Sequence, residues 1–149
     1  MRLKLYSLYA PRRIYLRSSG SLILDENEIY GPIVDEFCQL SSLKVLSMGS
    51  NRIEGTFPEC IGREMTSLTT LDLSNNLLQN TFPDSFFKLR HLRVLDLSQN
   101  SISGTISNEL LPDLKALTIA NIASNQFSGP LPSSFDTLPD LAYMHLDNK

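Results

Sequence analysis

The sequence lacks most of the features that assign a protein to a class at first sight. It has no run approaching the roughly 18–20 apolar residues that cross a bilayer, so we expect no membrane span. It has only 2 cysteines in 149 residues, too few for a framework of several disulfide bridges. It also contains no Asn-x-Ser/Thr acceptor for N-linked glycosylation.

A clear secretory signal and a basic face are missing as well. The apolar stretch near the N-terminus is broken by Ser7 and stopped by Pro11, whereas a signal peptide needs roughly 7–15 continuous apolar residues. The net charge is -3 at pH 7, and a nucleic-acid-binding protein usually shows a basic face. We therefore expect no nucleic-acid partner, and the compartment stays open.

A repeat of 24 or 25 residues dominates what is present. Hydrophobic residues make up 42% of the chain and charged ones 19%, the composition of a folded domain. The spacing Leu-x-x-Leu-x-Leu-x-x-Asn, or a close variant of it, leads to an asparagine in each copy: Asn27, Asn51, Asn76, Asn100 and Asn125. A single coil of this length cannot bury its apolar face alone, so the repeat indicates a stacked solenoid.

The spacing predicts a short strand in every repeat. The last two apolar residues, such as Leu71 and Leu73, lie two positions apart and point to the same side of an extended chain. After the strand the chain must turn sharply, which leaves backbone donors and acceptors inside the coil, away from water. An asparagine side chain carries both a donor and an acceptor, so we expect the five asparagines to satisfy these groups as a ladder.

A second apolar segment follows each asparagine, as in Ile53-x-Gly55-x-Phe57-Pro58. Glycine permits the positive φ of a tight bend, and Asn80, which replaces it in one repeat, is its usual substitute. Proline removes a backbone donor and limits helix formation. The return of each coil is therefore predicted to be irregular or 3₁₀ in conformation.

The combined pattern resembles the plant-type leucine-rich repeat, especially in LDLSNN of residues 71–76 and FSGPLP of residues 127–132. The resemblance covers about residues 18–149. It implies an α/β solenoid: a right-handed superhelix with a parallel β-sheet on the concave face and irregular or 3₁₀ returns on the convex face. Because the class includes the ectodomains of receptor-like proteins and receptor-like kinases, it also implies an extracellular or plasma-membrane location.

The same resemblance implies a role. In that class the concave face commonly binds the ligand, so we interpret the chain as a non-enzymatic module that recognises a protein or a peptide. It would be a fragment or truncated form of a plant cell-surface receptor-like protein, acting in signal perception or defence. The alternatives are a secreted protein similar to polygalacturonase inhibitors and an inert truncated fragment.

Both ends of the chain depart from the repeat. We expect residues 1–17 to be a degenerate N-terminal remnant and residues 18–149 to be a leucine-rich-repeat domain of about five repeats. The paired-cysteine cap of the class is missing at the start, and Lys149 stands where the next asparagine would come. The domain is therefore predicted to lack clear caps, on which the stability of a solenoid depends.

Side chains between the core leucines are expected on the concave face, in rows that run from strand to strand. The candidate ligand-binding residues are Val45, Ser47, Thr70, Asp72, Ser74, Val94, Asp96, Ser98, Ile119, Asn121, Tyr143 and His145. The exposed apolar and aromatic members fit a partner-contact patch. β-branched residues also favour strands without binding anything, so both interpretations stand.

Candidates for catalysis or metal binding are few. Asp72 and Asp96 should be neighbours, and close carboxylates can share a proton or hold a metal, but aspartate is common at this position of the class. His145 and Asp147 lie two residues apart, and two ligands do not make a metal site. We predict no catalytic residue, no metal and no cofactor.

The spacing of the two cysteines leaves their pairing open. Cys38 and Cys60 lie on successive convex returns, 11 and 9 residues past their asparagines. Their expected proximity allows a disulfide. The difference in phase is at least as consistent with two half-buried free thiols, since free cysteine often behaves as a small hydrophobic residue.

Overall fold

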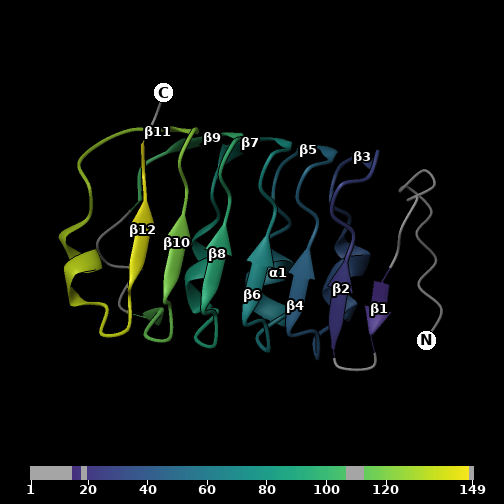
Figure 1. The fold of residues 1–149 in the computed structure, drawn as a ribbon, viewed down its shortest axis with the longest axis horizontal. Helices are drawn as coiled ribbons and strands as arrows, with labels where there is room; N and C mark the ends of the chain where they lie inside the picture. Colours follow the sequence, from purple (N-terminus) through teal and green to yellow (C-terminus); the bar gives the residue numbers. More distant parts are fainter. Residues whose placement is uncertain (1–14, 18–19, 107–112, 148–149) are drawn as a thin grey trace.

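The computed structural model describes residues 15–17, 20–106 and 113–147 of the chain. These residues form a solenoid whose repeats each add one strand to a large inner sheet. Figure 1 looks onto this sheet, with the N-terminal strands at the right and the C-terminal strands at the left. The structure confirms the α/β solenoid with a parallel sheet that the repeat predicts.

The inner sheet has seven strands in the order β1-β2-β4-β6-β8-β10-β12. All strands from β2 to β12 are parallel and in register, so corresponding residues of successive repeats lie side by side. The strands are β1 (Tyr15–Arg17), β2 (Ser21–Ile23), β4 (Val45–Ser47), β6 (Thr70–Asp72), β8 (Val94–Asp96), β10 (Ile119–Asn121) and β12 (Tyr143–His145).

Strand β1 runs in the opposite direction to the others. It pairs antiparallel with β2, with Tyr15 opposite Ile23 and Arg17 opposite Ser21. A remnant of an earlier coil, as predicted for residues 1–17, would supply a parallel strand, so residues 15–17 differ from the repeat in direction. Residues 1–14 of that predicted segment lie outside the described residues.

The second apolar segments form an outer sheet of short parallel strands in the order β11-β9-β7-β5-β3. These strands are β3 (Tyr30–Gly31), β5 (Arg52–Gly55), β7 (Leu77–Thr81), β9 (Ser101–Gly104) and β11 (Gln126–Phe127). The turns at Gly31, Gly55, Gly104 and Gly129 have positive φ, and so does the substitute Asn80, at 69°. The bend predicted after each asparagine is thus present.

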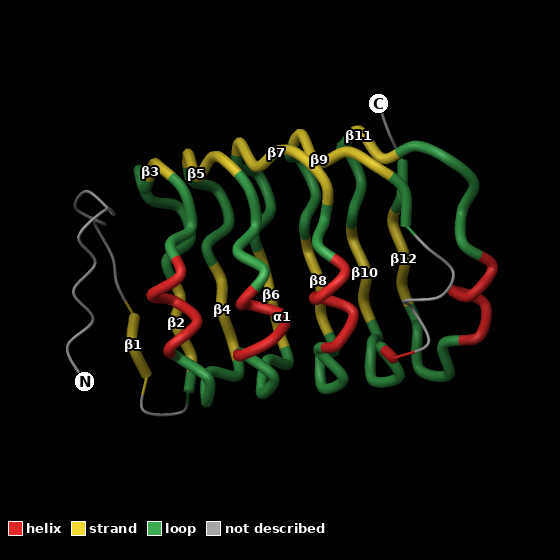
Figure 2. The backbone as a smooth tube through the Cα atoms, turned by 180° about the vertical axis from the view of Figure 1, so that it is seen from behind, coloured by secondary structure: helices red, strands yellow, loops and turns green. Residues whose placement is uncertain are grey.

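Short helices line the convex side, as seen from behind in Figure 2. Three are 3₁₀ helices, as predicted for the returns: η1 (Asp35–Gln39), η2 (Asp84–Lys88) and η4 (Ser133–Thr137). The fourth, α1 (Cys60–Glu64), is a single α-helical turn. None of the described helices is long and apolar enough to cross a membrane.

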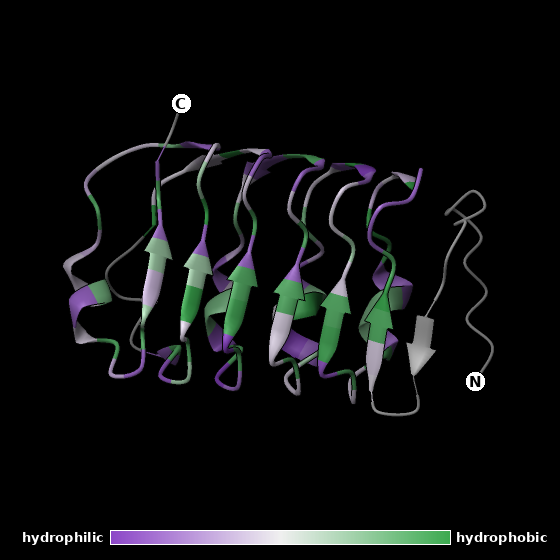
Figure 3. Cartoon of the chain, in the orientation of Figure 1, coloured by the Kyte–Doolittle hydropathy of each residue, from purple (hydrophilic) through white to green (hydrophobic). Residues whose placement is uncertain are grey.

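The core lies between the inner sheet and the convex helices. Each coil contributes strand leucines and a closing apolar pair; Leu71, Leu73, Phe86 and Leu89 are all at most 1% exposed. Figure 3 shows this distribution, with largely hydrophobic strands and hydrophilic turns at their ends. Burying one such side chain contributes roughly 1.5–3 kcal/mol, so most of the stability comes from contacts between neighbouring coils.

The five repeat asparagines form a hydrogen-bonded column, the asparagine ladder, just beyond the strands. The Nδ2 of Asn76 donates to the carbonyls of Leu73 (3.2 Å) and Ser74 (3.0 Å) in its own coil, and to the carbonyl of Met48 (3.0 Å) in the preceding coil. Its Oδ1 accepts the backbone N–H of Ile53 at 2.9 Å. Asn76 therefore joins two coils, and so do Asn51, Asn100 and Asn125.

The same contacts recur along the ladder. Asn51, Asn100 and Asn125 accept the backbone N–H groups of Ile29, Leu78 and Ile102 at 3.0–3.1 Å. A feature that the sequence did not reveal accompanies them: the residue before each ladder asparagine has a φ of 51–56°. These residues are Glu26, Ser50, Asn75, Gln99 and Ser124.

Cys38 and Cys60 form a disulfide on the convex side, with their Cα atoms 5.8 Å apart. The alternative of two free thiols is wrong. Cys38 lies within η1 and Cys60 opens α1, and these two helices pack against each other. The two cysteines are therefore close in space, although they lie at different positions of their repeats. In the loop-entropy model, closing a loop of about 22 residues stabilises the folded state by about 3 kcal/mol.

Asn76→Ala should lower the free energy of unfolding by roughly 1–3 kcal/mol, because it leaves the buried N–H of Ile53 without its acceptor. The carbonyls of Met48, Leu73 and Ser74 each keep a second donor. Urea denaturation measures the change. The matched control is Asn75→Gly: this asparagine is exposed, and glycine tolerates its φ of 51°. An equal loss in the two variants would contradict the role given to the ladder.

Candidate functional site

The concave face is the side of strands β2 to β12 that points away from the core. The strand register aligns one row of residues, Val45, Thr70, Val94, Ile119 and Tyr143. It aligns a second row, Ser47, Asp72, Asp96, Asn121 and His145, and Ser74 and Ser98 follow two residues after the aspartates. The structure thus brings all the candidate residues together on one face, while their role in binding stays a prediction.

The aspartates of this face are held by neighbouring hydroxyl and backbone groups. Asp72 Oδ1 accepts the hydroxyl of Ser74 at 2.7 Å and its backbone N–H at 2.9 Å. Asp96 Oδ1 makes the same two contacts with Ser98, and its Oδ2 accepts Nδ2 of Asn121 at 3.0 Å. These contacts, which the sequence analysis did not anticipate, fix the orientation of the carboxylates.

Asp25 belongs to the same group although it was not among the candidates. Its Oδ1 accepts the hydroxyl of Ser47 and the backbone N–H of Gly49, both at 2.7 Å, from the next coil. The sequence could have indicated Asp25 by its repeat position, which is that of Ser74, two residues after that of Asp72. The carboxylates of the first, third and fourth coils are therefore fixed, Asp72 within its repeat, Asp25 by the next repeat and Asp96 by both.

The surroundings of Asp72 raise the pKa of its carboxyl. Burial raises the pKa of this carboxyl, and the charges of Asp96 and Asp25 raise it further, whereas the hydrogen bonds from Ser74 lower it. The aspartates lie on an open sheet. Within the described residues, no group of three or more His, Cys, Asp or Glu side chains could hold a metal ion. The arrangement suits polar recognition of a ligand.

The C-terminal part of the concave face is apolar and aromatic. Ile119 is 38% exposed and its neighbour Tyr143 is 52% exposed. The rings of Tyr143 and His145 are in edge contact with centroids 6.3 Å apart, and His145 Nε2 lies 3.3 Å from Asp147 Oδ2. Side chains of this type bury apolar area when a partner docks.

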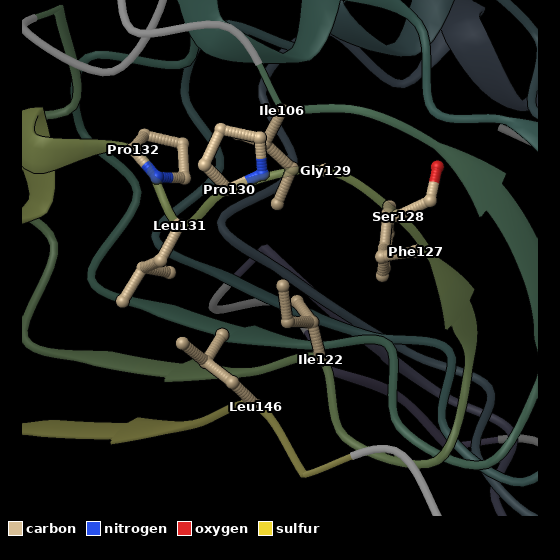
Figure 4. Close-up of a pocket in the computed structure, with 9 residues that line it drawn as sticks. All are labelled: Ile106, Ile122, Phe127, Ser128, Gly129, Pro130, Leu131, Pro132 and Leu146. Carbon is tan, nitrogen blue, oxygen red and sulfur yellow. The ribbon is translucent and has the colours of Figure 1, made fainter.

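A separate hollow of about 190 Å³ lies at the C-terminal end of the core, between the inner and outer sheets. In Figure 4, Leu131 and the flanking prolines stand on one side of it and Ile122 and Leu146 on the other. Leu131 is 55% exposed, whereas Phe57, at the same position of an earlier repeat, is 4% exposed. The hollow is therefore a core position that no further described coil covers.

Comparisons with known proteins agree with this geometry. Family models described as leucine-rich repeat match residues 42–63 and 66–127. The structure is similar to the solved leucine-rich-repeat ectodomain of the receptor kinase SOBIR1 from Arabidopsis thaliana, with a TM-score of 0.79 and 30% identity. That match covers 85% of this chain and 68% of the other. The chain belongs to the leucine-rich-repeat family.

Other leucine-rich-repeat relatives are much longer than this chain. It is 42% identical over 52 residues to Receptor-like protein 31 of Arabidopsis thaliana, a match of 35% of this chain and 6% of that protein. The ectodomain of the Arabidopsis receptor kinase GASSHO1/SCHENGEN3, solved in complex with CASPARIAN STRIP INTEGRITY FACTOR 2, has a TM-score of 0.83 and 32% identity. The match covers 87% of this chain and 15% of that ectodomain.

Asp72→Asn should raise the Tm at pH 7. The carboxyl has a higher pKa in the folded protein than in the unfolded chain, so its ionisation favours unfolding. The loss of folding stability caused by this ionisation is complete above the folded-state pKa and disappears below the ordinary pKa of 3.8. The asparagine oxygen can still accept the hydrogen bonds from Ser74.

Thermal denaturation at several pH values measures this effect, on protein made without glycosylation because the substitution creates the acceptor Asn-Leu-Ser. The gain in Tm should shrink as the pH falls towards 3. Asp84→Asn is the control, because Asp84 is exposed on the convex side and its replacement should change the Tm little at any pH. If Asp72→Asn lowered the Tm equally at all pH values, the raised pKa of Asp72 would be refuted.

Proposed function

We propose that this chain is a recognition module that binds a peptide or protein ligand on its concave face. The observation that carries the proposal is the register of six parallel strands, which aligns outward side chains into continuous polar and apolar rows. A solenoid commonly binds partners on this extended surface. Interface residues on rigid strands also lose little conformational freedom when a ligand docks.

The dimensions suit an extended peptide. Strands β2 to β12 are separated by five steps of about 4.8 Å, a length of about 24 Å. At about 3.3 Å per residue, a peptide lying across the strands would cover this length with about seven residues. The face offers both hydrogen-bonding groups, such as Asn121, and exposed apolar groups, such as Ile119 and Tyr143.

The relatives support a setting for this activity. The similar ectodomain of the plant membrane receptor kinase GASSHO1/SCHENGEN3 was solved in complex with CASPARIAN STRIP INTEGRITY FACTOR 2, and Receptor-like protein 31 matches part of the repeat. We therefore place the chain in a plant cell-surface receptor-like protein, as a section of a longer repeat array. Its role there is ligand perception in signalling or defence.

A glycan placed on the concave face tests the proposal. Asp96→Asn creates the acceptor Asn-Leu-Ser on β8, and Glu64→Asn creates Asn-Met-Thr on the exposed convex side of α1. Both variants replace one acidic residue and gain one glycan when made in a secretory host. They form a matched pair that differs in the face carrying the glycan.

Peptides are first selected from a random 12-residue phage-display library on the unmodified chain. The selected peptides should bind the Glu64→Asn glycoprotein normally and the Asp96→Asn glycoprotein at least about tenfold more weakly, because the glycan covers the concave face. Biolayer interferometry gives the affinities, and equal Tm values show that both variants are folded. Equal binding to the two glycoproteins, or no enriched peptide, would refute the proposal.

A further inference from the structure

The concave face is divided along the solenoid into two chemically different halves. Its N-terminal half, over β2 to β8, carries Asp25, Asp72 and Asp96, which we call the acidic half. Its C-terminal half, over β10 and β12, carries the exposed Ile119 and Tyr143, which we call the apolar half, although Asn121, His145 and Asp147 lie beside them. Because the strand order is linear, a ligand lying across the strands would meet the two halves in sequence.

The negative charge of this face has no basic counterpart on the strands that form it. Residues 21–25, 45–49, 70–74, 94–98, 119–123 and 143–147 include 4 aspartates and no lysine or arginine. The nearest basic residues along these segments, Lys44 and Arg93, are exposed and precede β4 and β8. Burial raises the pKa of Asp72, as do the like charges of Asp96 and Asp25, and no cation among the described residues lowers it.

The acidic half is closely packed around Gly49, which is buried. Gly49 lies between Asp25 and Asp72, and a Cβ on it would come within 3.5 Å and 3.2 Å of their Oδ1 atoms. Those Oδ1 atoms accept the hydrogen bonds described above, whereas their Oδ2 atoms accept none from the described residues. The absence of a side chain at position 49 thus lets the carboxylates of Asp25 and Asp72 pack close to each other, and each keeps one oxygen that accepts no hydrogen bond from the described residues.

The two halves are separated by a defined distance. Asp72 on β6 is two strands from Ile119 and three from Tyr143, or about 10–14 Å at about 4.8 Å per strand. An extended peptide spans this distance with three or four residues. Charge and spacing together specify what a complementary ligand would carry.

We propose that the concave face binds an extended peptide with an arginine or lysine and, three or four residues away, an aromatic or branched aliphatic side chain. The basic group would lie against Asp72, where a guanidinium can donate to the carboxylate oxygen that accepts no bond from the described residues, and the charge of Asp25, on the other side of Gly49, adds to the attraction. The apolar side chain would pack on Ile119 and Tyr143. This inference rests on the proposed function, and it specifies the chemistry of the partner.

The sequences selected from the random library give the first test. Arginine or lysine should be enriched together with an aromatic or aliphatic residue three or four positions away. Selection on Asp25→Asn/Asp72→Asn should lose the basic residue and keep the apolar one. The control Asp84→Asn/Asp136→Asn changes the net charge equally on the exposed convex side and should select the same peptides as the wild type. All variants are made without glycosylation and with the disulfide formed.

A synthetic version of one selected peptide gives the second test. Replacing its basic residue by glutamine should weaken binding to the wild type at least about tenfold, and binding to Asp25→Asn/Asp72→Asn less than about threefold, in titration calorimetry. Enrichment of neutral or acidic peptides, or an equal glutamine effect on both proteins, would overturn the inference while leaving the proposed function intact. No enrichment at all, or selected peptides indifferent to the concave glycan, would refute the proposed function itself.

Discussion

The rest of the solenoid depends on the hydrogen bonds that the side-chain amides of the ladder asparagines make. After every strand the chain turns inside the coil, where its backbone groups cannot reach water. Asn76 satisfies carbonyls of two coils and one N–H of the preceding coil with a single side chain. No aliphatic residue could do this, and an unsatisfied buried group costs roughly 1–3 kcal/mol. A residue of this kind therefore stabilises the turn.

The ladder also determines what the concave face presents. Since Asn51, Asn76, Asn100 and Asn125 each join their coil to the preceding one, neighbouring coils cannot shift along the strand direction without breaking these bonds. The strands consequently stay in register, with Asp72 beside Asp96 and Ile119 beside Tyr143. A regular core thus produces a surface whose rows differ only in the side chains that point outward. The chemistry of recognition resides in those variable positions.

The sequence predicts the parts of the structure that follow from the repeat, and misses those that do not. Strands, outward rows and the bends at Gly55 and Asn80 follow from spacing and residue type. The positive φ before each ladder asparagine has no residue signature, because glutamate, serine, asparagine and glutamine all occupy it. The disulfide was left open because Cys38 and Cys60 differ in phase, and only the packing of η1 on α1 brings them together.

Amide hydrogen exchange measured by NMR tests the central claim most directly. The N–H groups of Ile29, Ile53, Leu78 and Ile102 are not paired within the inner sheet and donate to ladder oxygens. They should exchange as slowly as amides of the central strands, and Asn76→Ala should release Ile53 alone. Exchange of all four at the rate of exposed convex loops would contradict the account.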